Sequence, residues 1–217
     1  MNILAELAEQ ARALSKLLAV LVLLPLLALT AVVIGSARMG TPVGDLLSDP
    51  AAILDAAPWT GLISNFGALL WCATASISLF TWSVLQRRPE SRQFSKFVLS
   101  AALITTVLLL DDLFLFHEWI FPRYLGVTER TTFSAYLVLI AVWLVLARRT
   151  ILSTEYLILL LAFGFFGLSL FVDTYDEIDR LITSWRQIYE DGFKLLGIAA
   201  WFGYFSRCCF VEMRRTT

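Results

Sequence analysis

The chain has 217 residues, of which 59% are hydrophobic and 16% charged, and its mean hydropathy is +0.75. A soluble domain carries about 25% charged residues, so this composition excludes an ordinary water-soluble enzyme or binding domain. The formal net charge of -1 excludes the basic surplus of a nucleic-acid-binding protein. We therefore expect an all-α fold, a polytopic transmembrane helical bundle whose first partner is the lipid bilayer.

The N-terminal region combines a short amphipathic segment with a long apolar one. The apolar run 17–36 is longer than the core of a secretory signal, and Glu6 and Glu9 replace the basic leader of a signal. The run is therefore predicted to be a retained membrane anchor, although Gly35–Ala37 loosely resembles a cleavage site. The preceding apolar residues recur at helical spacing and predict a lead-in along the membrane surface: Ile3, Leu4, Leu7, Ala11 and Leu14.

Six segments approach the roughly 20 apolar residues that a helix needs to cross a bilayer. They are 17–36, 59–85, 97–121, 132–147, 151–172 and 193–211. The fourth is the shortest, but Phe133, Tyr136 and Trp143 place aromatic rings near its ends, as at a membrane interface. With no internal repeat and no long linker, the sequence predicts one membrane domain over 1–217.

The charged residues predict the orientation of these spans. Eleven of the seventeen Lys and Arg residues fall on the side that holds both termini, which we therefore expect to be cytoplasmic. Thirteen of the eighteen carboxylates fall on the opposite side. We place the protein in a bacterial inner membrane with acidic loops on the non-cytoplasmic side. Solvation of the loops alone is an alternative explanation for the acids outside the spans.

The third segment carries two adjacent acids, Asp111 and Asp112, about 20 Å along the helix from Lys96 at its inner boundary. An ionised Asp at the centre of a span costs about 2.5–3.5 kcal/mol, so these two residues need partners, protonation or water. On a continuous helix, Glu118 lies on nearly the same face as Asp111, and Asp112 and His117 flank it. The alternative is that the helix ends earlier and leaves both acids in the headgroup region.

A second acidic group follows the fifth segment, where Asp173, Asp176 and Glu177 are candidate helix caps. They lead into an amphipathic pattern that predicts either an outer-surface helix before the last span or an extension of that span. The pattern comprises Ile178, Leu181, Ile182, Trp185, Ile188 and Tyr189.

The third acidic group, Glu190 and Asp191, stands four and three residues before Lys194, at helical ion-pair spacing. Lys194 enters the sixth span, where it can snorkel outward or neutralise Asp111 or Asp112. Asn65 of the second span is predicted to lie at the same depth as the two aspartates.

His117 is the only histidine, so any metal site is dominated by carboxylates and suits a hard divalent cation such as Ca²⁺, Mg²⁺ or Mn²⁺. A simple hydrogen-bonding role for His117 at the interface is the alternative. The candidate metal ligands are Asp111, Asp112, His117, Glu118 and Glu190. The candidate proton relays or counter-charges are Lys194, Asp173, Asp191 and Asn65.

Three classes of function fit these residues. The first is a transporter, channel or sensor that handles a cation, either a proton or a hard divalent metal, through an outward-facing carboxylate cluster. The second is a metal-dependent membrane enzyme that acts on a lipid or isoprenoid. The third is a non-catalytic subunit of a membrane complex, and a homo-oligomer or a complex partner is compatible with each class.

Overall fold

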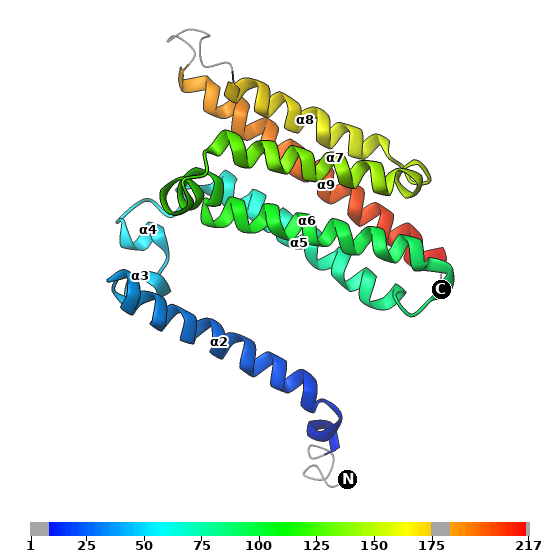
Figure 1. The fold of residues 1–217 in the computed structure, drawn as a ribbon, viewed down its shortest axis with the longest axis horizontal. Helices are drawn as coiled ribbons and strands as arrows, with labels where there is room; N and C mark the ends of the chain where they lie inside the picture. Colours follow the sequence, from blue (N-terminus) through cyan, green and yellow to red (C-terminus); the bar gives the residue numbers. More distant parts are fainter. Residues whose placement is uncertain (1–8, 175–182, 216–217) are drawn as a thin grey trace. The chain divides into compact units, whose positions relative to one another are not determined.

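A computed structural model describes residues 9–174 and 183–215, and every regular element in these ranges is a helix (Figure 1). This confirms the predicted all-α class. Four helices are long and apolar enough to cross a membrane: α2 (Ser15–Met39), α5 (Leu62–Leu85), the continuous stretch Pro89–Phe114, and α7 (Glu129–Leu152). The chain forms two compact units, Met1–Thr60 and Gly61–Thr217.

The first unit contains α2 and two short helices, α3 (Val43–Leu47) and α4 (Pro50–Ile53). Helix α2 is apolar on all sides, and most of its leucines and valines are exposed, which is typical of a lipid-facing helix. It ends at Gly40, whose left-handed backbone allows its N–H to bond Ser36 O at 2.9 Å. Of the predicted lead-in, residues 1–8 lie outside the described residues, and 9–13 are helical.

The second unit is a helical bundle of α5, α6 (Arg92–Phe114), α7, α8 (Leu157–Thr174) and α9 (Thr183–Arg215), which run alongside one another in Figure 1. Helix α5 packs against α6 and α9, and α9 packs against α8. Helix α7 contacts α6 and the π-helical segment η2 (Phe116–Leu125). Side chains from all five helices can therefore meet in one core.

Trp201 of α9 is the centre of that core and is only 1% exposed. Its indole N–H donates to Thr105 Oγ1 of α6 at 3.1 Å, which satisfies the polar atom of a buried aromatic residue. Its ring centroid lies 5.0–6.1 Å from those of four aromatic residues of α5, α7, α8 and α9: Trp71, Trp143, Phe163 and Phe205.

Several helix boundaries differ from the predicted segments. Helix α7 has 24 residues, so the segment predicted as the shortest is a full-length candidate span that also contains the start of the predicted segment 151–172. Thr128, the residue before α7, caps its first turn: the side-chain hydroxyl of Thr128 accepts the N–H of Thr131 at 3.3 Å. From Thr183 onward the amphipathic segment forms the start of α9, while 175–182 lie outside the described residues.

The prediction of one helix from 97 to 121 is wrong. Helix α6 ends at Phe114, Leu115 adopts a left-handed backbone (φ 53°, ψ 44°), and η2 follows. The N–H of Leu115 bonds the carbonyl of Asp111, which closes the last turn of α6. Because the chain turns here, the helical-wheel positions predicted for His117 and Glu118 do not apply.

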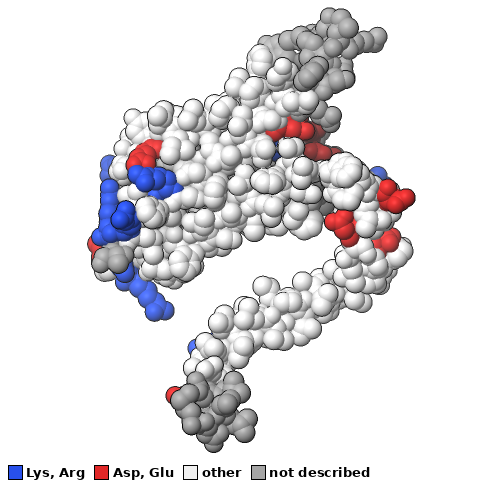
Figure 2. All heavy atoms as spheres, turned by 180° about the vertical axis from the view of Figure 1, so that it is seen from behind, with Lys and Arg blue, Asp and Glu red and all other residues white. Residues whose placement is uncertain are grey.

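The two ends of the bundle carry opposite charge. Most acids of α6, α7 and α9 lie where α6 ends and where α7 and α9 begin, and most bases lie at the other end, since α6 runs in the opposite direction to α7 and α9 (Figure 1). Basic side chains gather at one end in Figure 2, where Arg149, Arg207 and Arg215 line a common cavity. Arg207 forms a bidentate pair with Glu155 there, at 2.8 and 2.9 Å.

Candidate functional site

Asp111 lies in the last turn of α6 and is 5% exposed. Its Oδ1 accepts the backbone N–H of His117 at 3.0 Å and the hydroxyl of Tyr136 at 2.9 Å, and its Oδ2 lies 2.5 Å from Nδ1 of His117. A buried carboxylate is costly unless it is hydrogen-bonded, and these three bonds supply the partners. The carboxylate therefore joins α6, η2 and α7 at one point.

The same carboxylate explains why η2 begins where it does. The first N–H groups of a helical segment have no partner within the segment, and a side-chain oxygen usually accepts one of them. Asp111 does this for His117 from the preceding helix, across the left-handed turn at Leu115. The turn brings the imidazole back over the end of α6 instead of projecting it from a continuous helix.

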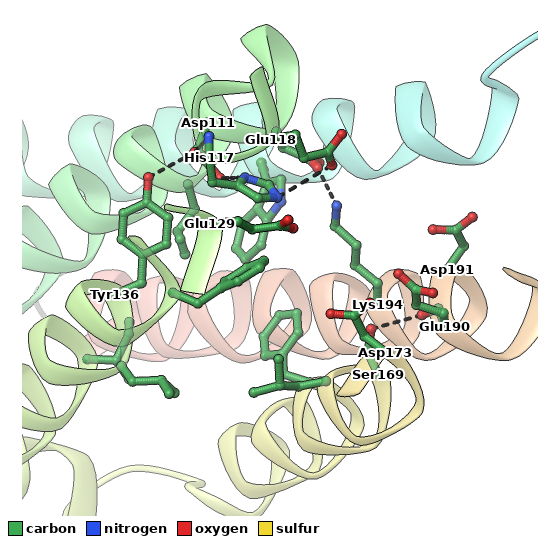
Figure 3. Close-up of a pocket in the computed structure, with 18 of the residues that line it drawn as sticks. Asp111, His117, Glu118, Glu129, Tyr136, Ser169, Asp173, Glu190, Asp191 and Lys194 are labelled. Carbon is green, nitrogen blue, oxygen red and sulfur yellow. Dashed lines mark hydrogen bonds and ion pairs between the residues drawn. The ribbon is translucent and has the colours of Figure 1, made fainter. Parts of the chain in front are cut away.

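His117 lies between a buried and an exposed carboxylate (Figure 3). Its Nδ1 faces Asp111, and its Nε2 lies 3.4 Å from Oε1 of Glu118, whose side chain is 50% exposed. The ring packs against Phe133, with centroids 4.7 Å apart. Burial disfavours the charged imidazolium and lowers the pKa of His117. The hydrogen bond to Asp111 and the negative charges of Asp111 and Glu118 outweigh this effect, so the pKa of His117 is raised.

Asp112 has a different partner from Asp111. Its Oδ1 lies 2.5 Å from Nζ of Lys194 on α9, and its side chain is 9% exposed against 41% for the lysine. Gly67 of α5 lies beside this pair: a Cβ there would meet Oδ2 of Asp112 at 3.8 Å, an ordinary contact, but would crowd Cδ1 of Ile198 of α9 at 3.1 Å. The ion pair therefore links α6 to α9 next to Gly67, where α5 has no side chain.

These groups open onto a cavity of about 350 Å³. Acidic side chains of η2, α7, α8 and α9 surround it, as Figure 3 shows: Glu118, Glu129, Asp173, Glu190 and Asp191. Its deeper surface is aromatic, with Trp71 and Trp201 buried and Phe163 and Phe166 half-buried. The Ser169 hydroxyl donates to the carbonyl of Glu190 at 2.9 Å, which joins α8 to α9 along the wall.

The cavity brings together most of the residues that the sequence singles out. Asp111, Asp112, His117, Glu118, Asp173, Glu190, Asp191 and Lys194 all line it. Asn65 does not: it is exposed on α5 and is absent from the lining. Sequence reasoning missed the roles of Tyr136 and Glu129, the first because it has the pattern of an interface aromatic residue and the second because it begins a helix among other outer acids.

The adjacent aspartates do not act as a single ligand pair, because Asp111 bonds His117 and Tyr136 while Asp112 pairs with Lys194. Within residues 9–174 and 183–215, no three His, Cys, Asp or Glu side chains are grouped so that they could hold a metal ion. What the arrangement does offer is a histidine in contact with two carboxylates of different exposure. Such a set can accept and release a proton near neutral pH.

A family model described as "Domain of unknown function (DUF8692)" matches residues 17–208, and the chain belongs to this family. The match extends over both compact units. No curated protein and no solved structure matches the chain.

Proposed function

We propose that this member of the DUF8692 family is a multi-pass membrane protein that handles protons through an outward-facing cavity, as a transporter, channel or sensor. The observation that carries the proposal is the position of His117 between the buried Asp111 and the exposed Glu118. The imidazole is the only side chain with an ordinary pKa near neutrality, and here each of its nitrogens faces a carboxylate.

The arrangement of the bundle supports a membrane location for the protein, with His117 just beyond the end of a candidate span. Helices α8 and α9 would complete six spans with the four long apolar helices, because α8 is apolar and α9 packs against both α5 and α8. The basic end, with Arg149, Arg207 and Arg215, would face the cytoplasm under the positive-inside rule. The acidic cavity would then face the other side, as expected from the distribution of charge along the sequence.

In this proposal a proton enters from the cavity and moves in two steps. Glu118 collects it at the exposed surface and passes it to Nε2 of His117. With Nδ1–H directed at Asp111, the imidazolium is held by the carboxylate, and transfer of the Nδ1 proton then protonates Asp111. Tyr136 donates to the other oxygen of Asp111, Oδ1, and so holds this carboxylate in place. Lys194 neutralises Asp112, so that this second acid does not compete for the proton.

Proton movement into vesicles tests this proposal. The purified full-length chain is reconstituted with a pH-sensitive dye inside the vesicles, and a pH step is applied with the membrane potential clamped. We expect His117→Gln and Asp111→Asn to abolish the protein-dependent proton flux, while Asp45→Asn, an exposed carboxylate of the first unit, retains it. Flux at the wild-type level in both folded site variants refutes the proposal. Adding Ca²⁺, Mg²⁺ or Mn²⁺ to the same assay tests the divalent-metal alternative.

A non-catalytic subunit is the second candidate, favoured by the Lys194–Asp112 ion pair. A pair of this kind can fix two helices without moving any ion. This candidate predicts that site variants lose thermal stability or assembly with a membrane partner while the wild-type vesicles show no proton flux. The cavity beside the pair favours the first proposal, because a purely structural ion pair needs no open space next to it.

A further inference from the structure

The cavity beside His117 is much larger than a proton site requires, and its surface is divided into an aromatic base and an acidic opening. From this division we infer that the cavity binds an organic monocation with an apolar body, such as an aromatic amine or a quaternary ammonium compound. The inference rests on the proposed function in one respect: the compound would be the species whose binding or passage is linked to the proton.

The base of the cavity is a packed aromatic surface. Trp71 of α5 stacks on Phe166 of α8, with centroids 5.9 Å apart and planes 11° from parallel. Trp201 meets Trp71 edge-on at 6.1 Å and Phe163 edge-on at 5.9 Å. These rings come from three helices and hold one another in place, so the surface is preformed. Aromatic faces of this kind attract ammonium groups through their quadrupole.

Apolar side chains of the opposite helices complete the enclosure. Leu108 of α6 and Leu137 and Ile140 of α7 line the cavity together with Phe133. The volume of about 350 Å³ falls within the range of small-molecule sites, roughly 300–1,000 Å³, which are mostly apolar with a few polar groups. The shape and chemistry therefore suit a compound with a hydrocarbon body.

The charge around the opening selects for cations. Seven carboxylates and one lysine line the cavity, and that lysine, Lys194, is paired with Asp112. Three of the acids, Glu118, Glu129 and Asp191, are exposed and present negative charge at the surface. A cavity of one sign with apolar walls concentrates counter-ions and repels anions.

An inorganic cation would gain less from this cavity than an organic one. Hard cations require several oxygen ligands in place of their water, and the aromatic base offers none. An ammonium group is less strongly hydrated when alkylated, and its apolar body gains from leaving water. Both halves of the cavity are then used by the same molecule, with its charge near the acids and its body against the half-buried rings of Phe163 and Phe166, which the buried Trp71 and Trp201 support.

Binding of three small probes to the purified full-length chain in detergent tests the inference. Benzyltrimethylammonium carries the charge and the ring, tetramethylammonium carries only the charge, and phenylacetate carries the ring with the opposite charge. We expect saturable calorimetric binding of benzyltrimethylammonium, affinity lower by about tenfold for tetramethylammonium, and no binding of phenylacetate. Equal binding of phenylacetate, or no binding of benzyltrimethylammonium, overturns the inference.

Two variants locate the bound probe. Glu129→Gln changes one exposed carboxylate, and Phe166→Leu removes one ring of the base while keeping an apolar side chain. Each is expected to lower the affinity for benzyltrimethylammonium by about three- to tenfold, whereas Glu90→Gln at the basic end leaves this affinity unchanged. Unchanged affinity in Glu129→Gln, whose exposed side chain does not threaten folding, overturns the inference even if Phe166→Leu is unstable.

The failure of this inference is distinguishable from the failure of the proposed function. If the probe does not bind but His117→Gln still abolishes proton flux, the organic-cation site is refuted and the proton relay stands. If the probe binds and is weakened by Glu129→Gln while proton flux is unaffected by His117→Gln, the organic-cation site stands and the relay is refuted.

Discussion

Lys194 of α9 places its Nζ 2.5 Å from Oδ1 of Asp112 on α6, which joins two helices that are 82 residues apart at this point. The aspartate is nearly buried, with 9% of its side chain exposed, while 41% of the lysine side chain is exposed. The carboxylate therefore depends on the lysine for its counter-charge more than the lysine depends on the carboxylate. The ion pair also frees Asp111, the neighbouring acid, to bond His117 and Tyr136.

Lys194→Met is expected to lower stability, because it leaves Asp112 nearly buried without its cation. Removing one partner of a fully buried pair costs about 3–5 kcal/mol, and the exposure of Lys194 reduces the expected loss to about 1–3 kcal/mol. Thermal unfolding of the purified chain in one detergent measures the change.

The double variant Asp112→Asn with Lys194→Met is the matched control for this prediction. It removes both charges, so we expect it to recover part of the stability that Lys194→Met loses. Asp112→Asn is also measured alone in the wild-type chain. If it destabilises the Lys194→Met variant by as much as it destabilises the wild type, the two side chains are not coupled and the prediction is wrong.

The pH dependence of stability is expected to report on His117, which lies in η2 beyond the end of the candidate span Pro89–Phe114. The pKa of His117 is raised above its usual 6.5, because the bond and charge of Asp111 outweigh burial. Folding therefore favours the imidazolium. This contribution is fully present below about pH 6.5 and is lost as pH rises through the folded pKa.

The measurement is Tm against pH for the wild-type chain and for His117→Gln. The stability advantage of the wild type is expected to be largest on the acid side of pH 6.5 and to shrink as the pH increases above it. An advantage that grows with pH, or one that does not change, contradicts the raised pKa.

The sequence predicts the class of this fold well because lipid imposes a simple rule. A long apolar run with basic residues at its ends has few alternatives to a spanning helix, and α2, α5 and α7 follow that rule. The turn at Leu115 was not predictable in the same way. An apolar run gives no signal for a left-handed leucine, and the compensating bond from Asp111 to the N–H of His117 depends on side-chain geometry across the turn.

The charged part of the site was also accessible from the sequence, because acids within an apolar segment are costly and must be explained. Asp111, Asp112 and Lys194 were identified on that basis alone. The aromatic base was not, since Trp71 and Phe166 have the same pattern as residues that pack in a core or face lipid. Only the packing of α5 against α9, and of α9 against α8, brings them to one cavity.

Gly197→Ala is expected to disturb the aromatic base from the α9 side. A Cβ at position 197 would lie 2.6 Å from Cδ1 and Cε1 of Phe166, so the ring must move. Overpacking of this kind costs about 1–3 kcal/mol, which exceeds the gain of about 0.5–1 kcal/mol from replacing a helical glycine by alanine. We expect a net loss in Tm and weaker binding of benzyltrimethylammonium.

Gly203→Ala on the same helix is the control, since its Cβ would meet only Cγ2 of Ile158, at 4.0 Å. It is expected to raise stability by about 0.5–1 kcal/mol through helix propensity and to leave probe binding unchanged. The reverse order of stability for the two alanine variants would show that Phe166 does not rest on Gly197.

Tyr136→Phe tests whether the tyrosine hydroxyl only holds Asp111 in place or also takes part in proton transfer. The hydroxyl donates to Oδ1 at 2.9 Å, and hydrogen bonds to charged groups contribute about 1.5–3 kcal/mol. His117 still supplies two bonds to the same carboxylate, so we expect a smaller loss of about 1 kcal/mol, seen as a lower Tm. Tyr124→Phe, on an exposed tyrosine of η2, is expected to have no measurable effect.

Because the contact between His117 and Asp111 does not pass through Tyr136, proton flux should persist in Tyr136→Phe while it is lost in His117→Gln. Complete loss of flux in a folded Tyr136→Phe protein would instead make the hydroxyl part of the proton path.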